Sequence, residues 1–405
     1  MTVSRSAEVA VVGGGPAGAA LAAQLARAGR EVVVFERLAR PRWRAGGVYS
    51  SPLTRRRLLR LGLTSSEVAE LLRPISAMVV QTADASAAAR LAYEAPDHAC
   101  GVDRVRLEER LLEHAGRQGA LVCPAATVRH VRLGEGSSEL LVSADGGLAR
   151  WRARLVVGAD GPASMVARAA GTAHKTRRFR RAALTGHRHD AQAPADASVP
   201  LQARMIVGLG WYLGIAPVPG QRVNLGYVLG ESSLRRELTG GAHPAAMIDM
   251  ALARVRGPDR RWLDASPTDE VQAHLPLAHR VSRTAGPGYL LVGDAAGFLD
   301  PLSGEGLHRA LVSAELAAQA VAKWSSGDRS ALSDYDRRLR ARFRSKDVLS
   351  WLLQLFLLQP QMTRYALERL SRREDLSATF ARGLADLAPA SGLIDPRFHL
   401  RLLTA

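Results

Sequence analysis

The sequence contains little cysteine, little lysine and no long apolar run. Its 405 residues include two cysteines, Cys100 and Cys123, whose spacing fits neither a disulfide framework nor a metal site. We therefore expect buried thiols, a reducing cytoplasmic location and no bound metal. The longest apolar run, at residues 348–358, is about half of the roughly 20 residues that a membrane-spanning helix needs. No secretory leader is expected, because the first residues are polar and lead directly into a strand.

Acidic residues are scarce relative to basic ones. The net charge is +17, and almost all of the positive charge is arginine, since lysine occurs only at Lys175, Lys323 and Lys346. A basic field favours anionic partners, but the clusters are scattered and no helix-turn-helix signature accompanies them, so we do not expect nucleic-acid binding. The basic run at residues 337–346 precedes the apolar run at 348–358, which leaves two interpretations. The apolar run packs onto the protein core, or it makes peripheral contact with a membrane surface.

The strongest local motif is the glycine-rich turn at residues 13–18, which follows an apolar strand and opens a helix rich in alanine and leucine. Gly13 permits a tight turn, Gly15 lets backbone approach a pyrophosphate, and Gly18 allows close packing of helix on strand. The helix N-terminus adds partial positive charge toward the phosphates. Glu36 ends the next strand, where it can accept hydrogen bonds from ribose hydroxyls and disfavours a 2′-phosphate. The pattern predicts bound FAD or NAD.

The chain after this unit alternates between strand and helix patterns. Residues 180–230 are rich in β-branched and aromatic residues with turn pairs between them, which predicts an antiparallel sheet. Helices are predicted at 306–324, 331–346 and 348–358. The fold class is therefore α/β, with a Rossmann-like FAD-binding domain, an inserted antiparallel-sheet substrate domain and a C-terminal helical region. The predicted boundaries are 1–74, 96–172 and 276–345 for the FAD-binding domain, 75–95 and 173–275 for the substrate domain, and 346–405 for the helical region.

Two further motifs bring in a resemblance to a known family. Residues 157–161 (VGADG) and 293–307, which contain GDAAG, Asp300-Pro301 and GEGL, resemble the Asp-Gly and Gly-Asp motifs of the para-hydroxybenzoate-hydroxylase-type flavoproteins. Arg104 opens an RxxLExxL helix that matches the arginine beside the flavin in this superfamily. The resemblance implies that Asp294 accepts hydrogen bonds from the ribityl hydroxyls of FAD. It also implies that the backbone after Gly304 approaches the flavin ring.

Within the superfamily the sequence is closest to the geranylgeranyl-reductase-like branch. The run GDAAGFLDPLSGEGLHRA and the loop at residues 41–47 resemble that branch, although the loop has no cysteine, which puts in doubt any chemistry that depends on that thiol. The Trp-x-Trp-x-Ile-Pro motif of the halogenases is missing, so halogenation is disfavoured. The candidate cofactor-binding residues are Gly13, Gly15, Pro16, Ala17, Gly18, Glu36, Arg37, Arg44, Gly47, Arg104, Val128, Asp294, Pro301, Gly304, Gly306 and Leu307.

The resemblance implies an FAD-dependent oxidoreductase whose flavin is reduced by NADPH or NADH and then acts on an apolar small molecule. We expect reduction of a C=C bond in an isoprenoid-like compound. The alternatives are a monooxygenase that hydroxylates a small molecule, and a non-catalytic redox sensor or membrane-surface module. No catalytic residue is assigned and the oligomeric state stays open. His308 has two interpretations. It donates a proton to the substrate or contacts the flavin, or it faces solvent or a phosphate at the start of its helix. Trp211 and Tyr212 fit the core better than a substrate pocket.

Overall fold

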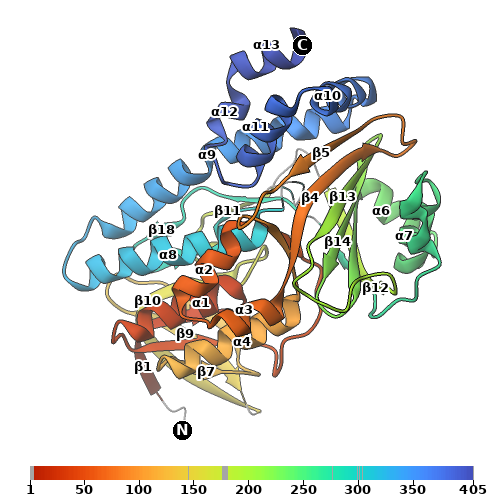
Figure 1. The fold of residues 1–405 in the computed structure, drawn as a ribbon. Coiled ribbons are helices and arrows are strands. Elements are labelled where there is room, and N and C mark those ends of the chain that lie inside the picture. The colour runs from red at the N-terminus through yellow and green to blue at the C-terminus, as the bar shows by residue number, and fades with distance from the viewer. Residues whose placement is uncertain are drawn as a thin grey trace.

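The structure, a computed structural model, describes residues 4–144, 146–175, 181–275, 277–298, 300, 302 and 304–404. Pro301, one of the candidate cofactor-binding residues, lies outside them. Figure 1 shows two sheets with helices on their faces, and a group of C-terminal helices at the end of the molecule opposite the N-terminus. The predicted α/β architecture is confirmed.

The first sheet has eight strands and a parallel centre. β1 lies between β10 and β2, and β19 and β7 extend the parallel order on either side. β2 and the second half of β1 read as apolar runs because both of their faces are buried, one against α1 and the other against β8, β9 and α5. The strands in order are β18 (Ala285–Gly286), β19 (Tyr289–Leu291), β10 (Gly147–Gly158), β1 (Ser4–Val12), β2 (Val32–Phe35) and β7 (Leu121–Cys123), with β9 (Ser138–Ala144) on β10 and β8 (Thr127–Arg132) on β9.

Helix α1 lies at the centre of the helical layer on this sheet, in contact with both α8 and α4. Its alanines let neighbouring helices approach closely, and nearly all of them are buried. Asp103 caps α4, because its side chain accepts a hydrogen bond from Arg106 N. The helices of this part are α1 (Pro16–Arg27), α2 (Leu53–Leu61), α3 (Ser65–Leu71), α4 (Arg104–Arg117), α5 (Met165–Ala169) and α8 (Gly306–Ser325), with a 3-10 turn, η2 (Gly293–Ala296), before α8.

The second sheet has nine strands and is antiparallel except where β13 pairs with β4 in parallel. One face packs against α6 (Glu231–Thr239), α7 (Pro244–Ala253) and η1 (Pro258–Leu263). The other face, called the inner face below, packs against the C-terminal helices and residues near the start of α8. The strands in order are β16 (Gln272–His274), β12 (Arg181–His189), β15 (Arg222–Gly230), β14 (Trp211–Val218), β13 (Leu201–Gly208), β4 (Leu72–Thr82), β6 (Ala99–Val102) and β3 (Tyr49–Ser50), with β5 (Ala88–Ala92) on β4.

Short strands outside the predicted substrate segments also join this second sheet. β3 pairs with β6, and β6 pairs with β4, so the chain crosses between the two sheets more often than the sequence indicates. β11 (Ala173–Lys175) and β17 (His279–Val281) form a separate two-stranded sheet from the two segments in which the chain passes between the first and the second sheet. The domain boundaries themselves stay predictions.

The C-terminal region begins with one long helix, α9 (Ala331–Leu357). The predicted break at residue 347 is wrong, because neither glycine nor proline interrupts this stretch and Asp347 is paired with Arg309 of α8. The first half of α9 packs on α8, and its second half covers the inner face of the second sheet. Within the described residues no helix is long and apolar enough to cross a membrane. The remaining helices are α10 (Pro360–Arg372), α11 (Glu374–Leu384), α12 (Ser391–Ile394) and α13 (Pro396–Thr404).

One buried hydrogen bond fastens α9 to the first sheet. Tyr335 Oη donates to Leu291 O at 2.6 Å, at the end of β19. We expect Tyr335→Phe to lower the free energy of unfolding by about 1–2 kcal/mol, since a buried bond is lost without a change of shape. Urea unfolding followed by circular dichroism measures this. Tyr365→Phe is the control, because Tyr365 Oη makes the same kind of bond, to Leu403 O, at the surface. Equal losses in the two variants would contradict the prediction.

Candidate flavin-binding site

In the first glycine turn, backbone atoms crowd Gly13 and Gly18, whereas Gly15 has free space beside it. Gly13 has φ 103°, and a Cβ there would lie 2.4 Å from Ala159 O, while a Cβ on Gly18 would lie 2.1 Å from Gly13 O. A Cβ on Gly15 would meet nothing within 4 Å. The turn therefore excludes side chains where strand and helix meet and leaves space above Gly15. Helix α1 begins at Pro16 without a side-chain cap, so its first amide groups remain available to an anion.

Glu36 holds this turn against the end of β2. Its Oε2 accepts a hydrogen bond from Gly14 N at 2.8 Å, and its Oε1 accepts one from Leu38 N at 3.0 Å. Each carboxylate oxygen keeps a lone pair for a further donor such as a ribose hydroxyl. Arg37 beside it is exposed. The side chain of Val128, another candidate residue, is buried in the core of the first sheet.

The second turn lies against the first, although the two are far apart in sequence. Gly293 has φ 57°, and a Cβ there would lie 2.8 Å from the Cβ of Ala17 in α1. Gly293 N donates to Ser313 Oγ of α8 at 2.8 Å. The structure therefore brings the two predicted glycine motifs together where β1, β10 and β19 end.

Asp294 follows in η2 and is surrounded by basic groups. Burial raises the pKa of its carboxyl, and the nearby His279 and Arg104 oppose that rise. His279 Nε2 contacts Asp294 O, and burial lowers the pKa of this histidine, so its ring is neutral at neutral pH. No motif in the sequence indicates His279, because it comes from β17, an element that pairs with distant β11.

The rest of the second turn is docked on the second sheet. Asp300 Oδ1 accepts hydrogen bonds from Tyr212 Oη of β14 at 2.7 Å and from Leu302 N at 2.9 Å. Tyr212 is buried, which agrees with the core interpretation. Gly304 has φ 65°, and a Cβ there would lie 2.3 Å from Tyr49 Cδ1. Helix α8 then begins at Gly306 without a side-chain cap, and Leu307 is buried in the core.

Glu108 joins the two predicted arginines. Its Oε2 lies 3.0 Å from Arg44 Nη2, and its Oε1 lies 2.9 Å from Arg104 Nη2. Arg104 Nη1 also donates to Gly47 O at 3.2 Å, so the loop after β2 is fastened to α4. Sequence reasoning missed the role of Glu108. The spacing of four residues from Arg104 in a predicted helix is a signal that could have found it.

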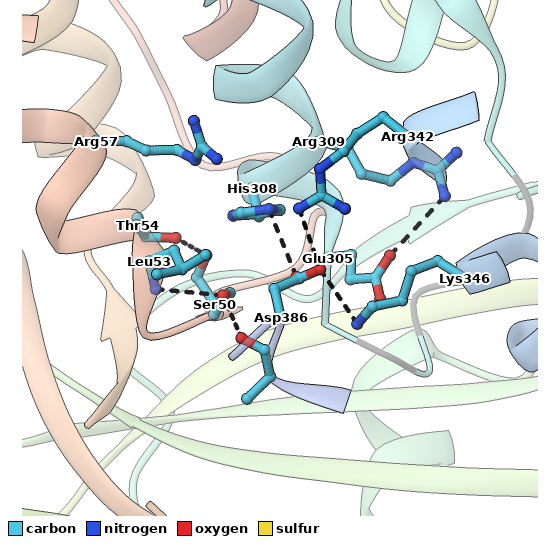
Figure 2. A network of polar contacts seen from close by, with 12 residues as sticks. Ser50, Leu53, Thr54, Arg57, Glu305, His308, Arg309, Arg342, Lys346 and Asp386 are labelled. Atoms are coloured by element: carbon cyan, nitrogen blue, oxygen red, sulfur yellow. Dashed lines mark hydrogen bonds and ion pairs between the residues drawn. The ribbon is translucent and has the colours of Figure 1, made fainter. Parts of the chain in front are cut away.

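A buried cluster of charged side chains lies beneath the second turn, and Figure 2 shows its members converging from α8, α9 and the chain after α11. Lys346 Nζ lies 2.7 Å from Glu305 Oε1 and donates to Leu384 O at 2.7 Å. Asp386, whose φ is 64°, lies 3.5 Å from Lys346 and 3.5 Å from His308. None of the four ionisable side chains is more than 4% exposed. The cluster therefore ties the second turn to the C-terminal helices.

The position of His308 corrects one interpretation of the sequence. It was expected to face solvent or a phosphate, or to donate a proton, but its ring is fully buried and lies toward Asp386. Burial lowers the pKa of His308 to about 3, so the ring is neutral at neutral pH. The solvent-facing interpretation is wrong because the C-terminal helices cover the start of α8.

These residues fit a flavin dinucleotide. The space above Gly15 and the uncapped start of α1 suit a pyrophosphate, Glu36 offers acceptors beside it, and the uncapped start of α8 lies at the other end of the site. That each predicted residue contacts FAD stays a prediction. Two glycine turns that meet at the carboxyl ends of parallel strands, with a second sheet over them, define the FAD-dependent oxidoreductases of the para-hydroxybenzoate-hydroxylase-like class.

The comparisons with known proteins agree with this class. The family model described as "FAD binding domain" matches residues 6–346, and the chain belongs to that family. It is 30% identical over 329 residues to the menaquinone reductase of Mycolicibacterium smegmatis, covering 78% of this chain and 76% of that protein. It is 28% identical over 352 residues to digeranylgeranylglycerophospholipid reductase 1 of Methanopyrus kandleri, covering 83% of this chain and 87% of that protein. The chain is thus an FAD-dependent oxidoreductase.

Solved structures show the same fold. A geranylgeranyl bacteriochlorophyll reductase-like protein of Thermoplasma acidophilum superposes with a TM-score of 0.78 at 18% identity, over 94% of this chain and 96% of that chain. Flavin-dependent halogenases and a Pseudomonas aeruginosa protein described as "a probable FAD-dependent monooxygenase" share the fold as well. The fold alone therefore does not choose among these reactions.

The open space at Gly15 predicts a specific loss of FAD. Gly15→Val places a side chain where the pyrophosphate would lie, and we expect FAD to bind at least tenfold more weakly, a change of about 1.4 kcal/mol. Titration by quenching of flavin fluorescence measures the affinity. Gly116→Val is the control, because a Cβ on Gly116 in α4 also meets nothing within 4 Å. A correctly folded Gly15→Val protein with unchanged FAD affinity would contradict the prediction.

The buried cluster predicts a large loss of stability when its buried lysine is removed. Lys346→Met leaves Glu305 and Asp386 buried without this partner, and we expect a loss of about 3–5 kcal/mol in urea unfolding. Lys323→Met, an exposed lysine of α8, is the control and should change little. The double variant Lys346→Met/Glu305→Gln should recover part of the loss.

The same variant has a predictable pH dependence. Burial raises the folded-state pKa of Glu305 above its ordinary 4.5, and loss of Lys346 raises it further. A carboxyl with a raised folded pKa favours folding fully below 4.5, and this contribution disappears as the pH rises through the folded value. The destabilisation by Lys346→Met should therefore be larger at pH 8 than at pH 4.5. The opposite trend would show that Glu305 is not the group left without a partner.

Proposed function

We propose that the chain uses NADPH or NADH to reduce its flavin and then reduces a C=C bond in an apolar, isoprenoid-like substrate. The relatives named as menaquinone reductase and digeranylgeranylglycerophospholipid reductase support this reaction class. The observation that carries the proposal is an apolar cavity that reaches the second turn.

The cavity has a volume of about 140 Å³ and lies between the inner face of the second sheet and the C-terminal helices. Among the described residues its lining has no charged side chain, and Tyr49, Thr363 and His399 are its polar members. The other lining residues are Met78, Val80, Ala89, Leu91, Met205, Val207, Leu302, Leu349, Leu352, Leu353, Phe356, Leu357, Ala366, Leu367, Leu370, Phe380, Leu384, Leu393, Phe398 and Leu402. An apolar cavity of similar size, about 150 Å³, binds benzene, so one isoprene-sized group fits.

Two of the three polar side chains at the edge of the cavity already have partners in the protein. Tyr49 Oη donates to Tyr93 Oη at 2.8 Å, and Thr363 Oγ1 donates to Phe356 O at 2.7 Å. Burial raises the pKa of Tyr49 well above its ordinary value, so the phenol stays neutral. A substrate that needed an ion pair or several hydrogen bonds for its orientation would find few of them. The cavity suits a hydrocarbon chain, which gains from burial of its apolar surface.

The cavity meets the flavin-binding side of the molecule at two residues. Leu302 belongs to the second turn, and Tyr49 packs against Gly304. A bound, reduced flavin would supply hydride at this end. The residues of the chain hold the alkene there, exclude water and leave the rest of the substrate among the C-terminal helices. This arrangement favours reduction of an alkene over hydroxylation of a polar aromatic acid.

Anaerobic turnover tests the reaction. We expect NADPH or NADH to be consumed without oxygen when menaquinone or a geranylgeranyl lipid is added in detergent, with two hydrogen atoms added to the polyprenyl chain of the product, located by fragment mass. A product heavier by one oxygen atom, with stoichiometric oxygen uptake, would show a monooxygenase instead. If neither substrate accelerates NAD(P)H consumption, the proposed reductase activity is wrong.

A cavity-filling variant tests the location. Leu353→Trp should raise KM for the polyprenyl substrate at least tenfold, since the indole occupies space that the chain needs, while FAD affinity stays unchanged. Leu148→Trp, at an exposed position on β10, is the control. Unchanged KM in a folded Leu353→Trp protein would place the substrate elsewhere.

A further inference from the structure

The second half of α9 is apolar on both of its faces. Leu353 and Phe356 line the cavity, whereas Leu355 and Leu358, at the end of the helix, face outward and are each 45% exposed. A helix on the surface of a soluble protein normally carries polar residues on its outward side. An outward apolar side next to an apolar cavity therefore needs an explanation beyond core packing.

Neighbouring elements add to this outward surface. Gly210 N donates to Leu357 O at 3.1 Å, which places the turn between β13 and β14, with Leu209 at 68% exposure, beside the end of α9. Met362 in the first turn of α10 is 51% exposed. We call Leu209, Leu355, Leu358 and Met362 the apolar corner. Contiguous exposed apolar side chains on one surface are typical of contact sites with lipid or protein.

The helices around the apolar corner are basic. Residues 331–405 contain 13 basic and 8 acidic side chains, and α10, which carries Met362, has three arginines against one glutamate and exposes Arg364 and Arg372. The chain as a whole has a net charge of +17. Basic side chains beside exposed apolar ones are the pattern of proteins that lie on anionic membranes. A second copy of the chain is a poorer partner, because it would bring two strongly positive molecules together.

We propose that the apolar corner inserts into the surface of an anionic membrane, and that a lipid substrate enters the cavity from the bilayer between α9 and α10. The entry route rests on the proposed function, whereas the membrane contact does not. The side chains that would separate lipid from cavity are Phe356 and Leu357, which line the cavity and lie between Leu355 and Leu358 in sequence. Figure 1 shows α10 and α13 at the end of the molecule away from the N-terminus, where such contact leaves the first sheet free.

The size of the cavity also favours this arrangement. At about 140 Å³ it holds a group of isoprene size and not a long polyprenyl chain. The remainder of such a substrate must extend past the rim of the cavity. If that rim lies in a bilayer, the remaining chain stays in an apolar surrounding throughout and is never exposed to water.

Vesicle sedimentation of the FAD-loaded protein tests the contact in the absence of substrate and NAD(P)H. Wild type should sediment with vesicles of phosphatidylcholine and phosphatidylglycerol, and much less with phosphatidylcholine alone. Leu355→Asp/Leu358→Asp should weaken binding at least tenfold. The matched control is Met250→Asp/Leu148→Asp, which adds the same charge at positions 45% and 57% exposed on α7 and β10. Circular dichroism and flavin content confirm that both variants fold.

Equal binding by the two double variants would overturn the membrane contact. The same holds if the wild-type protein forms dimers in vesicle-free solution that the corner variant abolishes, because the surface is then an interface between copies. The entry route has its own readout. The corner variant should lose activity at least tenfold on substrate in vesicles and keep it on substrate in detergent. If the corner variant loses activity on substrate in vesicles and on substrate in detergent alike, the entry route is wrong. If the wild-type protein is inactive on both forms of the substrate, the proposed function is wrong, and the sedimentation result alone then decides the membrane contact.

Discussion

The close approach of Gly293 to Ala17 is the constraint on which the site depends. A Cβ on Gly293 would lie 2.8 Å from the Cβ of Ala17, so any larger residue at either position would push η2 away from α1. That contact sets the distance between the start of α1 and the start of α8, the two uncapped helix ends that face the site. Because both helices rest on the same parallel strands, the separation is fixed by packing and needs no ligand to define it.

The second turn is then held from two further directions. Asp300 bonds to Tyr212 on the second sheet, and Glu305 is paired with Lys346 of α9. Burial of this many charges is costly, and an apolar core would be at least as stable. The polar contacts fix the orientation of the second turn, because an ion pair or a hydrogen bond depends on direction and apolar packing does not. The turn is thus held by the first sheet, the second sheet and the C-terminal helices together.

The sequence predicted those parts of the site that are encoded locally. Gly13, Gly15 and Gly18 follow from the geometry of one turn. Glu108 was within reach of the same reasoning through its spacing from Arg104. The same reasoning could not find His279, Asp386 or the pairing of Glu305 with Lys346, because each depends on segments that meet only in the folded chain. The supposed break at residue 347 and the exposure of His308 failed for the same reason, since tertiary packing decided both.

The glycine turns of the candidate flavin site and the helices that close one side of the apolar cavity come from different parts of the chain. The family match ends at residue 346, and reductases, halogenases and monooxygenases share the fold. The residues that close the cavity, such as Leu353, Phe356 and Leu367, lie beyond that point. Lys346 stands at the junction, with its charge under the second turn and its helix continuing into the cavity wall. Under the proposed function, a flavin site shared across the fold serves a particular substrate through the helices that close the cavity beside it.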